Sequence, residues 1–289
     1  MKICSGCGEK INSLGWRCPS CSHTPKLIEG YLAFAPELAE ASDGFEARFF
    51  SQLATLEAKN FWFRSRNRLI IWALQRYFSE AKNFLEIGCG TGFVLSGIEQ
   101  AFPKLALYGS EIFTTGLGFA SQRLSGAELF QMDARKIPFE NEFDVIGAFD
   151  VLEHIKEDTI VLEQMYRANA PGGGIVLTVP QHPFLWSQAD TYAHHVRRYR
   201  AQELKTKVER AGFKVLRMTS FVSLLLPLML VSRFRQRQHN PEYDATSELR
   251  ISGSMNAILE SVLNLERMAI CLGCSFPAGG SLLLIARRS

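Results

Sequence analysis

The sequence lacks three features that would each have fixed a broad class of protein. It has no apolar run of about 18 residues, which a membrane-spanning helix requires. It has no secretory signal, since Met1-Lys2-Ile3 leads straight into cysteines. Its net charge is only +3, so the strongly basic composition of many nucleic-acid-binding proteins is missing. These absences predict a cytoplasmic globular protein, and 47% hydrophobic residues allow it a sizeable core.

Cysteine is scarce outside the first 21 residues, which hold four of the seven. An odd total without a secretion signal argues against a disulfide framework and for a reducing cytoplasm. The first four form two CxxC pairs, and zinc prefers four such thiolates in a tetrahedron. A segment this short cannot bury its own core, so the metal must supply much of its folding free energy. We predict a structural zinc ribbon over residues 1–28, with ligands Cys4, Cys7, Cys18 and Cys21.

The rest of the chain, residues 29–289, is predicted to be one α/β domain with helices on both faces of its sheet. Strand-like runs, mostly separated by helical stretches, are expected at Phe84–Ile87, Leu105–Ser110, Glu128–Gln131, Phe143–Phe149, Gly174–Val179, Lys214–Ser220 and Ser281–Ala286. An apolar and helical insertion at about 221–276 separates the last two strands and includes a predicted helix over about 253–272. The stretch 60–78 predicts an amphipathic helix with a basic face ahead of the first strand.

The first strand leads into the glycine turn Gly88-Cys89-Gly90-Thr91-Gly92. In an open α/β sheet, cofactors bind beyond the carboxyl ends of the strands, and glycines let a ligand approach the backbone closely. Glu86 stands two residues before the first glycine. A carboxylate there would repel a pyrophosphate but attract a cationic amino-acid group. The turn therefore favours a cofactor that carries an ammonium or sulfonium over a dinucleotide.

Two more acids follow the next two strands. Glu111 lies 23 residues after Gly88, close to the spacing of an acid that accepts hydrogen bonds from ribose hydroxyls. Asp133 follows the third strand, where a carboxylate can accept from an adenine amino group. The fourth strand ends at Phe149 and leads into "DVLEHI". These residues together favour a nucleoside cofactor with a positive charge.

As a group, these motifs resemble those of class I S-adenosylmethionine-dependent methyltransferases, over roughly residues 60–220 and the last strand. The resemblance implies a Rossmann-like seven-stranded sheet whose seventh strand runs antiparallel between the fifth and sixth. It also implies S-adenosylmethionine as cofactor, with its methionine moiety at Glu86 and the glycine turn, its ribose at Glu111 and its adenine at Asp133. The candidate cofactor residues are Glu86, Gly88, Cys89, Gly90, Gly92, Glu111, Ile112, Phe113, Asp133, Ala134 and Phe149.

A methyl group on a sulfonium is already activated, so a base is needed only where the acceptor must lose a proton. Asp150, Glu153 and His154 would share one face of a predicted helix. This face resembles the acid-and-histidine site of metal-dependent members of the family and could hold Mg²⁺ or supply a base. Alternatively, Glu153 and His154 support the cofactor pocket without a metal. The candidate catalytic residues are Asp150, His154, His194 and His195.

The stretch "HHVRRYRAQELKTKVERAGF" predicts a helix that ends at Gly212. Arg200 stands where similar methyltransferases often have the Ser or Thr of a capping box. We predict that Arg197, Arg198 and Tyr199 bind an anionic substrate, and the alternative is a solvated basic entry to the helix.

Three functions remain open, and the favoured one is methyl transfer to a small-molecule or lipid-like acceptor that is anionic or partly apolar. In that case the insertion forms an apolar lid or a surface anchor in peripheral contact with a membrane. The second is RNA methylation, since the ribbon and Glu29-Gly30-Tyr31 resemble bacterial ribosomal RNA guanine-N1 methyltransferases. Those enzymes lack "VLEHI", and the net charge is low for binding along phosphates. The third is a non-catalytic adaptor that binds a partner through the ribbon.

Overall fold

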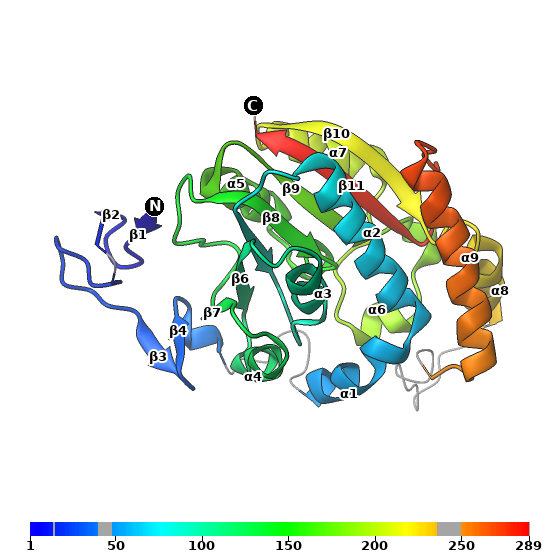
Figure 1. The fold of residues 1–289 in the computed structure, drawn as a ribbon, viewed down its shortest axis with the longest axis horizontal. Coiled ribbons are helices and arrows are strands. Elements are labelled where there is room, and N and C mark those ends of the chain that lie inside the picture. The colour runs from blue at the N-terminus through cyan, green and yellow to red at the C-terminus, as the bar shows by residue number, and fades with distance from the viewer. Residues whose placement is uncertain (14, 40–47, 236–249, 289) are drawn as a thin grey trace.

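The computed structural model describes residues 1–13, 15–39, 48–235 and 250–288. A nine-stranded sheet runs through the molecule, and helices cover both of its faces (Figure 1). The strand order is β10-β11-β9-β8-β5-β6-β7-β4-β3. These strands span Phe213–Phe221 (β10), Ser281–Arg288 (β11), Asn169–Pro180 (β9), Phe143–Phe149 (β8), Asn83–Ile87 (β5), Ala106–Glu111 (β6), Glu128–Gln131 (β7), Tyr31–Ala33 (β4) and Lys26–Ile28 (β3).

Seven of these strands form the predicted Rossmann-like sheet. β5 pairs in parallel with β6 and β8, and β6 pairs with β7 and β8 with β9 in the same sense. β11 runs antiparallel to β9 on one side and to β10 on the other. The predicted antiparallel seventh strand between the fifth and sixth is therefore confirmed.

The prediction of seven strands is incomplete, because β4 and β3 extend the sheet to nine. Leu32 and Ala33 of β4 pair in parallel with Phe130 and Gln131 of β7, and β3 then pairs antiparallel with β4. Lys26–Ile28, which the sequence assigned to the ribbon, thus belongs to the large sheet. An open strand edge offers unpaired backbone groups, and β4 pairs with those of β7 while β3 covers β4 in turn.

The helices pack on the sheet as two layers, one on each face (Figure 1). One hydrophobic cluster contains the inward residues of α5 and α7, and the other contains those of α2, α3 and α4. Phe84 belongs to one cluster and Leu85 to the other, as the alternation of side chains along a strand requires. The helices are α1 (Arg48–Leu56), α2 (Phe61–Tyr77), α3 (Phe93–Ala101), α4 (Thr114–Arg123), α5 (Asp158–Ala168), α6 (Gln188–Tyr192), α7 (Ala201–Arg210), α8 (Leu226–Arg235) and α9 (Gly253–Cys271).

Helix boundaries agree with the sequence signals. α2 begins after Asn60, whose side chain accepts a hydrogen bond from the backbone N–H of Trp62 at 2.9 Å. α7 begins after Arg200, which makes no capping bond, and ends just before Gly212, whose φ is +105°. Within the described part of the chain, no helix is long and apolar enough to cross a membrane.

The N-terminal segment, with strands β1 (Lys2–Ile3) and β2 (Lys10–Ile11), packs against the domain beside β7 and β4. The buried ring of Trp16 contacts Phe34, Phe130 and Phe139, with ring centroids 4.5 to 6.3 Å apart. The backbone N–H of Ile3 also donates to the carbonyl of Pro138 at 2.9 Å. Of the roles left open for the ribbon, this packing favours a cap on the domain.

Candidate cofactor and catalytic site

The glycine turn after β5 has three residues in left-handed conformations, Gly88, Gly90 and Gly92, with φ of +66°, +53° and +74°. A Cβ on Gly88 would lie 2.6 Å from the side chain of Val151, and one on Gly92 would lie 2.9 Å from Cα of Ala120. Glycine is therefore required both for the conformation and for the close packing. Of the three, only Gly90 has room for a Cβ, whose nearest neighbour would be the ring of Phe50 at 3.8 Å.

Glu86, in β5, is buried, and its Oε2 has no hydrogen-bond partner among the described residues. Burial raises the pKa of this carboxyl well above its ordinary value, although the positive charge of Arg66 opposes the shift. A buried carboxylate without a partner is costly. A bound ammonium would supply both the missing hydrogen bond and the missing charge, so Glu86 suits a cationic ligand.

Glu111, at the end of β6, joins the glycine turn to the next loop. Its carboxylate accepts from the backbone N–H of Gly90 at 3.0 Å and from that of Ile112 at 2.8 Å. Burial raises the pKa of Glu111, and these backbone hydrogen bonds oppose the rise. Asp133, after β7, is also buried and is held by the guanidinium of Arg135 at 3.0 Å. The structure thus brings the three predicted acids to the carboxyl ends of three adjacent strands.

Three of the predicted cofactor residues direct their side chains into the hydrophobic core instead. A Cβ on Gly109 would lie 3.1 Å from Sγ of Cys89, and one on Gly147 would lie 2.6 Å from the ring of Phe149. Ala134 also belongs to a core cluster. Any contact of Cys89, Ala134 or Phe149 with a ligand must therefore come from the backbone.

The glycine turn has a cover that the sequence did not predict, formed by α1 and the 3-10 turn Glu57–Lys59. The buried ring of Phe50 lies against Gly116, where an added Cβ would meet it at 3.0 Å, and near Phe113, with ring centroids 6.3 Å apart. Glu57 accepts from Oγ1 of Thr91 at 2.6 Å and from Arg123 at 2.7 Å. A buried acid next to the turn therefore anchors the cover. The available sequence signal for this cover was the pair Phe49-Phe50 in an otherwise polar stretch.

Asp150 lies outside the helical face that the sequence predicted for it. Its φ is +58°, and the helical turn that follows is a single 3-10 turn, Leu152–His154. Its carboxylate forms an ion pair with Arg66, a buried side chain of α2 that also stacks over Trp62. The predicted shared face of Asp150, Glu153 and His154 is therefore wrong, because the chain turns sharply at Asp150 before the 3-10 turn begins.

Glu153 and His154 instead meet His195, and one ligand atom from each lies within 4.8 Å of the others. The rings of His154 and His195 pack edge to face with centroids 4.7 Å apart. Burial and the nearby His195 lower the pKa of His154 to about 3, so this imidazole is neutral. Of the two candidate histidines at 194 and 195, the structure brings only the second into the cluster, and His194 is exposed.

Asp190 holds His195 in place and was not found from the sequence. Its Oδ1 lies 2.9 Å from Nδ1 of His195 and 2.7 Å from Nε of Arg198. Burial would raise the pKa of Asp190, but the hydrogen bonds from His195 and Arg198 outweigh it and lower the pKa to about 2. A carboxylate that binds one nitrogen of an imidazole fixes the orientation of the other. In His195 the nitrogen left over is Nε2. The capping box between Ser187 and Asp190 was the available signal.

The expected Mg²⁺ site does not fit this donor set. Mg²⁺ takes oxygen ligands in octahedral geometry, whereas the cluster offers one carboxylate and two imidazoles. Asp150, the second carboxylate of the predicted set, is taken up by Arg66.

The predicted anion-binding patch is not formed by its three residues. Arg198 is buried on Asp190, and Arg197 forms an ion pair with Asp158. The hydroxyl of Tyr199, a fully buried side chain, donates to Asp158 at 2.6 Å. Because their charges and hydrogen bonds are used inside the domain, these side chains fix the segment that carries His195.

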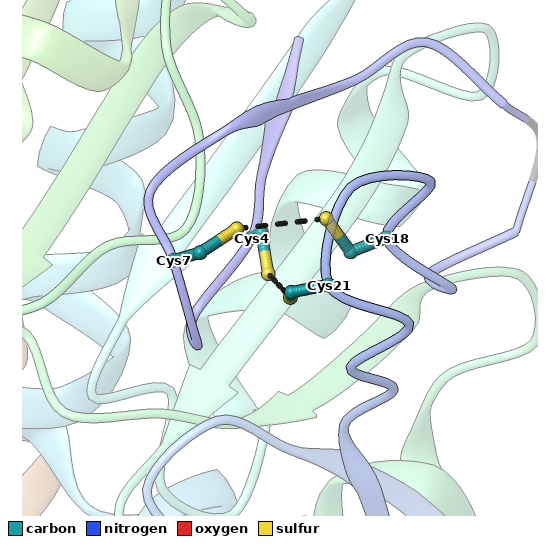
Figure 2. Close-up of side chains that lie close together, drawn as sticks. All are labelled: Cys4, Cys7, Cys18 and Cys21. Carbon is teal, nitrogen blue, oxygen red and sulfur yellow. Dashed lines mark hydrogen bonds between the residues drawn. The ribbon is translucent and has the colours of Figure 1, made fainter.

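The four N-terminal cysteines converge as predicted (Figure 2). Sγ of Cys4 lies 3.6 Å from that of Cys21, and Sγ of Cys7 lies 3.6 Å from that of Cys18. Thiolates about 2.3 Å from a tetrahedral zinc ion stand about 3.8 Å apart. The spacing and chemistry of the four sulfurs therefore fit zinc.

Comparison with known proteins identifies the large domain. A family model described as a methyltransferase domain matches residues 57–218, more than half of the chain. A probable S-adenosylmethionine-dependent methyltransferase of Mycolicibacterium smegmatis is 23% identical over 163 residues, which are 55% of this chain and 62% of that protein. A ubiquinone biosynthesis O-methyltransferase of Pseudomonas putida is 27% identical over 139 residues, 43% of this chain and 56% of the relative. The chain spans about half the length of the curated relatives it matches.

Solved structures share the fold at low identity. A SAM-dependent methyltransferase of Thermotoga maritima has a TM-score of 0.53 and 15% identity, over 84% of this chain and 97% of its own. The [4+2]-cyclase SpnF has a TM-score of 0.54 and 18% identity, over 78% and 82%. Since the fold also serves a cyclase, the activity must be argued from the site.

Proposed function

This chain belongs to the methyltransferase domain family, and from that premise we propose that it transfers a methyl group from S-adenosylmethionine to the hydroxyl of a lipid-like small molecule. The observation that carries the proposal is the set of three buried acids, Glu86, Glu111 and Asp133, around the glycine turn. Their order along the sheet suits the ammonium, the ribose and the adenine of this cofactor, and the unpartnered Oε2 of Glu86 suits its positive charge.

In this assignment the cofactor supplies an activated methyl group on its sulfonium. Glu86 binds the ammonium, Glu111 the ribose hydroxyls and Asp133 the adenine amino group, while Ile112 and Phe113 flank the adenine. The cover formed by α1 and Glu57–Lys59 excludes water from this region. Alignment and exclusion of water are the main demands on a protein that catalyses methyl transfer.

We assign the acceptor side to the cluster of Glu153, His154 and His195. A hydroxyl must lose its proton as the new C–O bond forms, and an imidazole oriented by a carboxylate is a suitable base. His195, held by Asp190, takes that proton. Neutral His154 donates its ring N–H to the acceptor oxygen and orients it.

Two observations favour a lipid-like acceptor. Phe184 and Trp186, which follow β9 at the carboxyl edge of the sheet, are 65% and 42% exposed and offer an apolar rim. This chain is similar to a ubiquinone biosynthesis O-methyltransferase, and that name points to a quinone-like acceptor for the relative. The alternative of RNA methylation has no such support, because Trp16 fixes the ribbon against the domain and Arg197 and Arg198 are paired internally.

For the N-terminal segment we propose one structural zinc ion, bound by Cys4, Cys7, Cys18 and Cys21. Four thiolates close the coordination shell, so the ion would stabilise the ribbon and take no part in methyl transfer. The ribbon then caps the domain through the contacts of Trp16.

The test is calorimetric titration of the whole protein with S-adenosylmethionine and S-adenosylhomocysteine, followed by a methylation assay. The acceptors are a matched series of phenols with and without a prenyl tail. We expect binding of both cofactor forms, and turnover that rises with the tail. Binding without turnover on any phenol would overturn the hydroxyl acceptor, and absence of binding would leave the adaptor as the better function.

A further inference from the structure

Helix α9 presents an unusual distribution of charge. Its acids face the protein: Glu260 forms ion pairs with Arg64 and Arg68 of α2, and buried Glu266 accepts from the backbone N–H of Ser223 and Leu224. Leu259, Leu263 and Ile270 of α9 face the core, but other large apolar residues of α9, and Leu272 just after it, face outward. The exposed fractions are 47% for Met255, 58% for Ile258, 62% for Leu265, 53% for Met268 and 86% for Leu272. A helix of a soluble domain normally carries polar residues on its outer face.

The region before and within α8 adds a second set of exposed apolar side chains. Leu224, Leu228 and Val231 are about half exposed, while Leu225 and Met229 pack against the core. Across the described residues 224–233 and 250–275, no carboxylate is exposed, and the exposed charged residue is Arg250. The surface of α8 and α9 is therefore apolar with a basic margin. An exposed apolar area of this extent on a soluble domain marks an interaction site.

This surface borders the acceptor side of the catalytic site. β9 and β10 are both antiparallel to β11, so they run in the same direction. Their carboxyl ends therefore lie at the same end of the sheet. α8 follows β10 there, just as exposed Phe184 and Trp186 follow β9. At the start of α9, Asn256 accepts from the backbone N–H of Phe61 at 2.8 Å, which places it at the beginning of α2. Arg66, one turn further along α2, pairs with Asp150 in the site.

We propose that α8 and α9 dock on an anionic lipid bilayer, with their exposed apolar side chains inserted at the headgroup boundary and the catalytic mouth facing the lipid. The proposal rests on the proposed function, because a lipid-like acceptor would enter the site from the bilayer. Interfacial helices bind through a buried apolar face and through attraction between basic residues and anionic headgroups. Among the described residues of this surface, Arg250 is the exposed charged side chain and no carboxylate is exposed, which gives the charge complementarity that such a surface needs.

A second copy of the chain fits this surface less well. The exposed residues belong to α8, α9 and the loop after β9, so they surround an edge of the sheet and do not form one narrow seam between two helices. A partner chain that buried all of them would also cover Phe184 and Trp186, the apolar rim assigned to the acceptor. A bilayer would instead deliver the acceptor to that rim.

The test is flotation of the full-length, zinc-loaded protein with vesicles of phosphatidylcholine alone or with one quarter phosphatidylglycerol. The double variant L265E/M268E places two charges on the exposed face, and L265S/M268S provides a milder second version. L27E is the matched control, because Leu27 is 68% exposed on β3, at the opposite edge of the sheet. We expect binding to the anionic vesicles that weakens with salt, a loss of roughly tenfold or more in the α9 variants, and wild-type binding in L27E.

Parallel measurements separate this inference from the function on which it rests. Titration with S-adenosylmethionine tests the function and should give the same affinity in every variant. Multi-angle light scattering tests the second copy and should give a monomer. Three results would overturn the docking surface: wild-type protein that ignores both kinds of vesicle, α9 variants that still bind them, or a wild-type dimer that the α9 variants dissociate.

Discussion

Oδ1 of Asp190 lies 2.9 Å from Nδ1 of His195, and the same oxygen lies 2.7 Å from Nε of Arg198. One buried carboxylate therefore fixes a histidine of the proposed acceptor cluster and neutralises a buried guanidinium. The His195 ring also packs edge to face with that of His154. In the sequence, residues 194–200 show only two adjacent histidines and a basic run. In the structure, His195 joins the cluster while Arg197 and Arg198 form ion pairs inside the domain.

We expect His195→Ala to lower kcat for a hydroxyl acceptor by about 10²- to 10⁴-fold, the usual contribution of a general base. The affinity for S-adenosylmethionine should not change, because His195 lies on the acceptor side. His194→Ala is the matched control, since that neighbour is exposed. Steady-state kinetics should show the loss of kcat in His195→Ala alone. Equal losses of kcat in the two variants would contradict the role of His195 as the base.

Glu86→Gln should weaken binding of S-adenosylmethionine by about 10- to 150-fold, because a charge-assisted hydrogen bond contributes about 1.5–3 kcal/mol. Titration calorimetry measures this loss, and S-adenosylhomocysteine, which keeps the ammonium, should lose affinity to a similar degree. An unchanged affinity would place the ammonium elsewhere.

The same variant should also change how stability depends on pH. Burial raises the pKa of Glu86 in the folded state, so that state binds more protons than the unfolded chain between the two pKa values. The free energy of unfolding without cofactor therefore falls as pH rises across that window. Glu86→Gln removes this contribution, so its Tm near neutral pH should exceed that of the wild type. A lower Tm across the whole range, measured by calorimetry without cofactor, would contradict this account.

Glu57→Gln should raise KM for S-adenosylmethionine by roughly tenfold, because it removes the charge that anchors the cover to Thr91 and Arg123. The effect on kcat should be smaller, since Glu57 does not reach the acceptor cluster. Lys59→Gln changes an exposed charge in the same turn and serves as the control. If kcat fell while KM stayed constant, the cover would have to act on the acceptor side.

Metal analysis should find one zinc ion for each chain, and Cys18→Ser should abolish its binding. Loss of the ion should lower Tm and shift the emission of Trp16 to longer wavelength, because its ring packs against the domain only when the ribbon is folded. Cys274→Ser, an exposed cysteine outside the cluster, should change neither property. A chelated protein with unchanged Tm would show that the ribbon needs no metal.

Local patterns in the sequence predicted the central part of the fold. The alternation of strand-like and helical stretches predicted the seven strands of the Rossmann-like sheet, because each strand is buried on both faces by neighbouring helices. The glycine turn and Glu86 followed from backbone geometry and charge, which act over a few residues. β3 and β4 were missed because strands of three residues have too little periodicity to be recognised.

The sequence by itself thus determined the seven Rossmann-like strands, the glycine turn and the four cysteines, since each is signalled by residues close together in the chain. Only the tertiary structure decided which polar side chains meet. It paired Arg66 with Asp150 across 84 positions, brought Glu57 to Arg123, and consumed the charges of Arg197 and Arg198 inside the domain. It also directed Glu260 and Glu266 of α9 toward partners in the protein. Long-range ion pairs leave no periodic trace in a sequence, because their energy depends on where the fold brings two distant segments together.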